Sequence, residues 1–440
     1  MGRAKALRTL LAIAVACALL SAASCTKKPA GDPPPLPPLS PRVVDEPVDL
    51  PAPRPKPEAP PDPVDQATVD ALVGAHAAFG LAMLGEITGG APEENVFISP
   101  TSIALALSMA VNGAAGETRE AMLTALQLSD MSIDDINAAS AQLMVSLAEA
   151  EPHVTLSLAN SLWAQEGIPF EAGFMATNDA FYQAEVSALD LSSPMAPKTI
   201  NAWVARQTHD RIADIVEAPI APQAILILIN ALYFKGEWYE PFEERDTEDG
   251  PFTLPDGRTE SVPLMLQWGN YAYLEMEGFQ AVRLPYAGKR AGMYIFLPSA
   301  DSDLEAFAEA LTPSTWQGWL EQFGEHEGHL RLPRFEIEYG TGLAKALARL
   351  GMGVAFSSAA DFANLTPMTA QITKAEHKTT LLVDENGTEA AAATLLQMAA
   401  SEDAPVDEPF EMIVNRPFFC AIVDQDTGSV LFAGYVVDPT

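Results

Sequence analysis

The chain has 440 residues, and 59 acidic against 25 basic residues give it a formal net charge of -34 at pH 7. This length allows two or three average domains, or one large mixed domain. The negative charge argues against binding to nucleic acid and against adsorption to an anionic lipid surface, whereas a basic partner would be attracted at low salt. Self-repulsion that keeps the protein soluble explains the same charge without any partner.

The first 24 residues are typical of an export signal. Basic residues precede an apolar segment at 10–20 that is shorter than a membrane-spanning helix. Small residues then lead into Cys25, a pattern that resembles a bacterial lipobox, in which this cysteine becomes the lipidated first residue of the mature protein. Ordinary cleavage nearby is the alternative. We predict a lipoprotein-type signal peptide at 1–24, export to the cell envelope, periplasm or extracellular space, and membrane contact only through a lipid anchor at Cys25.

Proline dominates residues 27–65. A chain this rich in proline forms neither helices nor β-ladders and prefers extended polyproline geometry, at about 3.1 Å per residue. About 40 such residues would extend roughly 120 Å, enough for a spacer that holds a domain away from a membrane. We therefore predict a disordered linker at 25–65, with a tail of no required length as the alternative.

The globular part is expected at 66–440, and it opens with helical patterns. Apolar residues predict a first helix that starts near Gln66. Ser99 followed by Pro100 is a typical start of a second helix, which is almost wholly apolar and should therefore be central. Residues 224–234 are apolar on both faces, as in the middle strand of a covered sheet.

Strand-like runs dominate the second half of the chain. Turn residues at 256–257 and 269–270 indicate hairpins, and one helical stretch is expected over 304–323. A strand is expected over 328–337, after a solvated turn at 326–329. Helices first and strands later, with pairing between distant segments, predict an α+β fold.

Residues 383–394 carry a turn signal and then small side chains, with neither bulky groups to bury nor a clear helix cap. Because alanine favours helices, 388–400 could form a surface helix. The Asn-Gly pair at 386–387 could instead start a hairpin with 388–397 as the returning strand. A third interpretation is a segment that changes state, in which alternate small residues enter a slot in a sheet. Composition leaves all three open.

Four runs in chain order resemble the serpins, the serine protease inhibitors: 95–100, 230–238, 387–394 and 415–418. The third of them resembles the hinge of the reactive-centre loop in inhibitory members. The resemblance implies a serpin fold of the α+β class, with three β-sheets, eight to nine helices and an exposed reactive-centre loop at about 385–410. It also implies that the large sheet can accept the loop as an additional strand.

The implied mechanism is suicide inhibition. A protease attacks the loop and forms its acyl-enzyme, and the freed hinge then inserts into the large sheet, which releases strain stored in a metastable fold. Small uncharged residues suit insertion because burying an unpaired charge is costly, and Glu389 falls on the outward parity. The hinge residues implied by the resemblance are Glu385, Gly387, Thr388, Glu389, Ala390, Ala391, Ala392, Ala393 and Thr394.

Two further sites are implied where the strands of the large sheet part. His377 would join a polar cluster beneath the sheet, the shutter, together with Ser99, Ser102 and Asn230. Neutral hydrogen-bonding groups can exchange partners as strands separate, which an apolar seam cannot do. Trp238 matches the tryptophan of the breach, where the loop first enters. The plain alternative for His377 is a satisfied structural histidine.

Counting from Gly387 in the usual register of the family places the reactive bond between Ser401 and Glu402, with Met398, Ala399 and Ala400 as alternatives. None of these residues is basic, so a trypsin-like target is disfavoured. Small or medium side chains suit elastase-like or subtilisin-like pockets.

We therefore expect a monomeric inhibitor of serine endopeptidases, or of cysteine endopeptidases, whose partner is the target protease in a covalent acyl complex. The alternative is a non-inhibitory protein of the same fold that acts as a binding protein or chaperone of the cell envelope. The sequence contains no nucleophile elbow, phosphate loop or zinc helix. An enzyme, a cofactor and a metal site are accordingly not expected.

Overall fold

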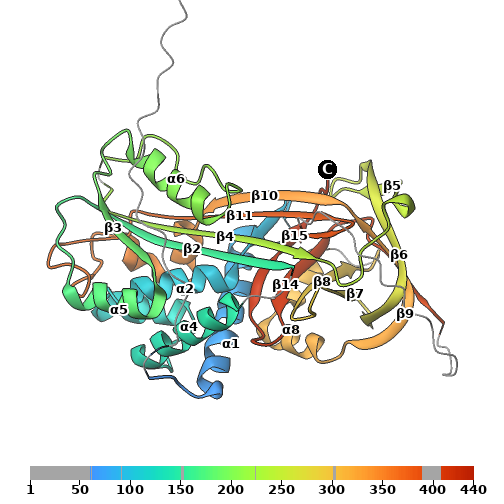
Figure 1. Cartoon of the computed structure of the whole chain (residues 1–440), viewed down its shortest axis with the longest axis horizontal. Coiled ribbons are helices and arrows are strands. Elements are labelled where there is room, and N and C mark those ends of the chain that lie inside the picture. The colour runs from blue at the N-terminus through green and yellow to red at the C-terminus, as the bar shows by residue number, and fades with distance from the viewer. Residues whose placement is uncertain are drawn as a thin grey trace, which may run out of the picture. The chain divides into compact units, whose positions relative to one another are not determined.

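The structure is a computed structural model, shown in Figure 1. It describes residues 60, 62–90, 92–149, 153–222, 224–300, 304–388 and 408–440. Several predictions fall outside these residues and stay predictions: the signal peptide, Cys25, most of the linker, the hinge from Glu389 onward and the candidate reactive bonds.

The described residues form nine α-helices, within the expected eight to nine. The second helix starts as its sequence predicts, with the Ser99 side chain accepting a hydrogen bond from the Ser102 amide and with Pro100 in the first turn, and all its residues are buried. The expected helix at 304–323 is instead two helices, because Pro313 starts a new one. The helices are α1 (Gln66–Thr88), α2 (Pro100–Val111), α3 (Gly116–Ala125), α4 (Ile133–Ala148), α5 (Ala172–Tyr182), α6 (Ala196–Gln207), α7 (Leu304–Ala310), α8 (Pro313–Leu320) and α9 (Ala344–Arg349).

A six-stranded sheet crosses the described domain, with α6 on one face and α2 on the other (Figure 1). Its strands, in spatial order, are β10 (Phe335–Gly342), β11 (Lys374–Asp384), β12 (Gly387–Thr388), β4 (Leu226–Glu237), β2 (Val154–Gln165) and β3 (Glu185–Leu189). Ile227 and Ile229 of β4 pack into the small core with α6, whereas Leu226 and Leu228 pack into the main core. The prediction that this strand is covered on both faces is confirmed.

The second sheet has nine strands, because the long strand β6 joins the two smaller sheets that the resemblance implies. Residues 259–264 of β6 pair with β5, residues 264–273 with β9 and residues 272–276 with β7. The strands are β1 (Val96–Ile98), β15 (Val430–Val436), β14 (Phe418–Asp424), β8 (Ala291–Pro298), β7 (Phe279–Pro285), β6 (Thr259–Met276), β9 (Gly324–Pro333), β13 (Phe410–Ile413) and β5 (Glu248–Thr253).

Two turn predictions in this sheet are wrong. The pair 269–270 lies inside β6, and 326–329 lies inside β9, and these two segments are paired with each other in register. Because each partner supplies the other's backbone hydrogen bonds, long-range pairing overrides the local preference of glycine and asparagine for turns. The expected strand at 328–337 is divided between β9 and β10.

Candidate functional site

The six-stranded sheet is closed in its middle and open at one end. Strands β11 and β4 pair directly in parallel from the pair Lys374 and Ile227 to the pair Thr380 and Tyr233. Beyond that point they separate, and β12 lies between them, antiparallel to both. Gly387 and Thr388, which belong to the predicted hinge, therefore already lie between β11 and β4 at the open end of the sheet.

The chain reverses between β11 and β12 through a tight turn at 385–386. The Asp384 carboxylate accepts hydrogen bonds from the amides of Asn386 (2.8 Å) and Gly387 (3.2 Å). The amides of Trp238 and Phe242 donate to the carbonyls of Asn386 and Glu385, both at 2.8 Å. Two of the three interpretations of this segment therefore apply as far as Thr388. The chain forms a hairpin, whose turn lies one residue earlier than expected, and the returning strand lies between two strands of the sheet.

Gly387 is required by the close approach of its neighbour in β4. Its φ is +152°, which L side chains rarely adopt, and a Cβ there would lie 2.1 Å from the Gly236 carbonyl oxygen. Any larger residue would push β12 away from β4.

Thr388 is fully buried and its hydroxyl lies 2.7 Å from the hydroxyl of Tyr286. The Tyr286 ring stacks on the predicted breach residue Trp238, with centroids 4.6 Å apart and an interplanar angle of 14°. The Trp238 indole nitrogen donates to the Asp384 carbonyl at 2.9 Å. The sequence identified Trp238 but missed Tyr286, which no motif marks.

Glu385 is buried beside the turn and makes an ion pair. Its Oε1 accepts from the Arg334 guanidinium at 2.5 Å and from the Thr247 hydroxyl at 2.7 Å. Burial raises the pKa of the Glu385 carboxyl, but these two donors more than offset that effect, so the pKa lies below its ordinary value. Glu385 is therefore charged and holds the turn; Arg334 and Thr247 carry no sequence signal of this role.

All four predicted shutter residues form one buried network between α2, β4 and β11. The Ser99 amide donates to Nε2 of His377 at 3.1 Å, and Nδ1 of His377 lies 2.6 Å from the Asn230 side-chain oxygen. The Asn230 amide group donates to Ser102 (2.5 Å) and to Asn160 (2.6 Å), a fifth member that the sequence analysis missed.

The protonation state of His377 follows from these partners. Nε2 accepts a hydrogen bond and Nδ1 faces an acceptor, so the ring is neutral with its proton on Nδ1. Burial lowers the pKa of His377 to about 3, and the contact with Asn230 opposes that shift only in part. The predicted shutter is thus a neutral network, whereas the charged Glu385 holds the turn between β11 and β12.

Comparison with known proteins identifies the family of this chain. The family model described as Serpin (serine protease inhibitor) matches residues 74–439. The chain belongs to the serpin family. An uncharacterized serpin-like protein of Thermococcus kodakarensis is 34% identical over 384 residues, which cover 86% of this chain and 88% of that protein. The leukocyte elastase inhibitor of Bos taurus is 33% identical and covers 84% of this chain and 100% of its own length.

Solved serpin structures show the same fold. Human thyroxine-binding globulin superimposes with a TM-score of 0.78 at 29% identity, over 85% of this chain and all of that chain. Serpins are generally protease inhibitors rather than catalysts, although the family also includes non-inhibitory members such as this globulin.

Proposed function

We propose that this serpin is a suicide inhibitor of serine endopeptidases, with cysteine endopeptidases as a second class of target. A protease attacks the reactive-centre loop as a substrate and forms an acyl-enzyme. Cleavage frees the hinge, which extends β12 between β11 and β4 and carries the acylated protease with it. The protease is then trapped because its active site is distorted.

One observation carries this proposal: β12 already lies in the open end of the sheet, with glycine and a small threonine in contact with β4. Insertion of further residues requires β11 and β4 to part along 374–380, where they now pair directly. The next inward positions, Ala390, Ala392 and Thr394, are small and uncharged, so their burial adds no unpaired charge.

Target choice is proposed from the loop sequence. Ser401 and Glu402 are the first candidates for the reactive bond, and Met398, Ala399 and Ala400 are the alternatives. An elastase-like or subtilisin-like protease suits these residues better than a trypsin-like one. Similarity to the leukocyte elastase inhibitor of Bos taurus favours the same class.

We also propose that the protein is an exported monomer, anchored through a lipid on Cys25 and carried on the linker at 25–65. The sequence of 1–25 supports this proposal. Mass spectrometry of the mature N-terminal peptide tests it: a lipidated Cys25, absent in Cys25→Ser, is expected. An unmodified Cys25, or cleavage elsewhere, would exclude the anchor.

The test of inhibition is a mixture of the purified protein with elastase-like, subtilisin-like and trypsin-like proteases, run on denaturing gels. A band at the summed mass that survives boiling in detergent is expected with the first two. Mass spectrometry of the released C-terminal peptide then identifies the cleaved bond.

Cleavage by every protease, with no such band and no gain in the heat stability of the cleaved product, would overturn the inhibitory mechanism. The fold likeness to thyroxine-binding globulin then favours the second candidate, a non-inhibitory binding protein or chaperone of the cell envelope.

A further inference from the structure

A pocket of about 150 Å³ lies beside the breach, between the end of β4, the strands β6 and β7, and the loop that joins β7 to β8. A cavity of about this volume holds one benzene ring, so the pocket admits a molecule with a single ring or a side chain of similar size. Trp238 and Tyr271 form part of its wall, and both are almost fully buried. Both rings are therefore fixed in place, and little of their surface is open to a ligand.

The floor of the pocket places opposite charges on either side of a small residue. Ala272 of β6 is paired with Arg283 of β7 on one side and with Glu325 of β9 on the other. Residues directly opposite in neighbouring antiparallel strands share one face of the sheet and lie roughly 5 Å apart. Because Ala272 ends at its Cβ, a space remains between the acid and the base.

These charges are not neutralised by each other. Within the described residues, no ion pair joins Arg283 or Lys289 to Glu240 or Glu325, although all four line the pocket. The Arg283 guanidinium donates to the Lys289 carbonyl at 3.2 Å, and its buried Nε has no hydrogen-bond partner in the part of the chain that the structure describes. The Lys289 ammonium lies 3.8 Å from the centroid of the Tyr239 ring.

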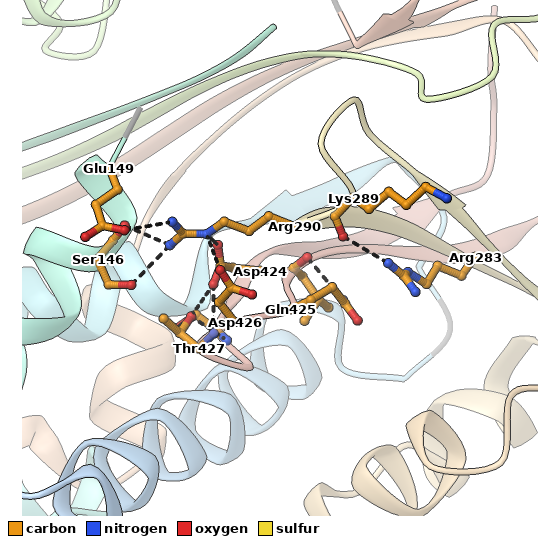
Figure 2. A network of polar contacts seen from close by, with 11 residues as sticks. Ser146, Glu149, Arg283, Lys289, Arg290, Asp424, Gln425, Asp426 and Thr427 are labelled. Atoms are coloured by element: carbon orange, nitrogen blue, oxygen red, sulfur yellow. Dashed lines mark hydrogen bonds and ion pairs between the residues drawn. The ribbon is translucent and has the colours of Figure 1, made fainter. Parts of the chain in front are cut away.

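The loop that carries Lys289 is anchored from its other side. Figure 2 shows the Arg290 side chain reaching Asp424 and Ser146, in the opposite direction from the Lys289 side chain, while Arg283 reaches the Lys289 carbonyl. Arg290 contacts the Asp424 carboxylate at 2.6 Å and the Ser146 carbonyl at 2.7 Å. The loop backbone at Lys289 and the Arg283 guanidinium are thus held in position before any ligand arrives.

We propose that this pocket binds a small zwitterion of amino-acid size with an aromatic or apolar side chain. Its carboxylate lies toward Arg283 and Lys289, and its ammonium group lies toward Glu325 and Glu240. Its side chain occupies the space over Ala272, between the two charged sides. A ligand with only one charge would leave the opposite side of the pocket unmatched, so both charges are needed.

The test is calorimetric titration of the full protein, without any protease, using L-phenylalanine as the probe. Phenylacetate lacks its ammonium group and phenethylamine lacks its carboxylate, so each is a matched half of the probe. We expect phenylalanine to bind at least about tenfold more tightly than either half, because each half loses one set of charge-assisted hydrogen bonds. No heat of binding for phenylalanine, or equal binding of a half, would overturn the proposal.

Variants test whether phenylalanine binds in this pocket. Ala272→Leu fills the floor and Glu325→Gln removes one exposed charge, and each should weaken phenylalanine binding at least about tenfold. Lys345→Gln, an exposed charge change on α9, is the control and should bind as the unaltered protein does. Glu325→Gln remains informative if Ala272→Leu fails to fold. Unchanged binding in Glu325→Gln would place the ligand elsewhere and refute the assignment, without bearing on protease trapping.

Discussion

Strands β11 and β4 pair directly at one end and part at the other, and we call this line between them the seam. Different interactions hold its two ends. Along 374–380 the strands share a direct backbone ladder, and a neutral side-chain network around Asn230 lies beneath them. At the other end the strands are apart and the short β12 fills the gap, held by an aromatic stack and by the ion pair of Glu385 with Arg334. The closed end is therefore held by a direct ladder between the two long strands, whereas the open end is held through contacts with the short β12.

This difference has a consequence for insertion. A hinge that extends β12 must replace the ladder between β11 and β4 with two new ladders, and the network at Asn230 must exchange partners meanwhile. Changes at the closed end should alter the global free energy of unfolding. Changes at the open end should alter the position of the hinge and the trapping of a protease.

The largest expected effect is from Thr388→Arg at the open end. The Thr388 side chain is fully buried, so an unpaired guanidinium there would cost about 3 kcal/mol or more, and β12 should leave the sheet. We expect the covalent complex with a susceptible protease to fall at least about tenfold, with the protein cleaved as a substrate. Thr388→Ser keeps the hydroxyl for Tyr286 and is the control. Normal trapping by Thr388→Arg would show that this position need not enter the sheet.

Asn230→Ala tests the closed end. It leaves His377, Ser102 and Asn160 without a shared partner in a buried site, so the free energy of unfolding should fall by about 3 kcal/mol. Denaturant unfolding measures this change. Asn270→Ala, an exposed position on β6, should change it little. Equally small changes in the unfolding free energy of both variants would show that the network does not stabilise the closed end.

Gly387→Ala should affect the open end of the seam and leave the closed end unchanged. The added Cβ would meet the Gly236 carbonyl, so β12 should be destabilised by about 2 kcal/mol. Hydrogen exchange should then show faster exchange at Gly387 and Thr388, with unchanged protection around His377. Gly278→Ala, where a Cβ has open space, is the control. A loss of protection spread over the whole seam would mean that the ends are not independent.

Acid should weaken the closed end before the open one. Burial lowers the pKa of His377 from 6.5 to about 3, and that of His76 likewise to about 3. A group whose pKa is lower in the folded state stabilises the protein fully above its unfolded pKa, and the stabilisation is lost as the pH falls. Unfolding free energy should therefore fall below about pH 6.5, by about 1.4 kcal/mol per pH unit for each histidine.

Replacing one of the two histidines measures its share of the pH dependence of the unfolding free energy. His76→Leu removes a buried ring whose two nitrogens have no hydrogen-bond partner among the described residues, and it should halve the histidine contribution to the slope without altering the β11–β4 pairing. Denaturant unfolding at several pH values, with hydrogen exchange at His377, measures both changes. A slope unaffected by His76→Leu would contradict the neutral buried state of that histidine.

The smallest expected effect is from Glu385→Gln. Because Arg334 is 45% exposed, its ion pair with Glu385 should contribute only about 1 kcal/mol to holding the turn. The pKa of Glu385 is lowered from 4.5 in the folded protein, so this contribution is complete above about pH 4.5 and is lost as the pH falls through the folded pKa. Hydrogen exchange of the turn in the two proteins should differ at neutral pH and converge in acid. A difference that persists in acid would assign the effect to packing.

Much of the candidate site could be predicted from the sequence because its residues lie in short local runs. Ser99 is recognisable as a helix cap beside Pro100, whereas the roles of Trp238, which directly follows β4, and of Gly387 were implied by the resemblance of the runs 230–238 and 387–394 to serpins. Arg334, Thr247 and Tyr286 carry no such signal, because their role depends only on which distant residue they meet. The prediction of a hairpin at 269–270 and of a turn at 326–329 failed for the same reason, since pairing of β6 with β9 decides both.

The sequence by itself determined the α+β class and the apolar central strand and helix, because these depend on local composition and periodicity, whereas the hinge was implied by the resemblance of 387–394 to serpins. Only the tertiary structure decided that β11 and β4 part at one end, that β12 fills the gap and that Arg283 and Glu325 flank Ala272 on neighbouring strands. Each of these facts is a choice of partner between segments far apart in the chain. Such choices rest on packing and on long-range backbone pairing, which no local pattern encodes.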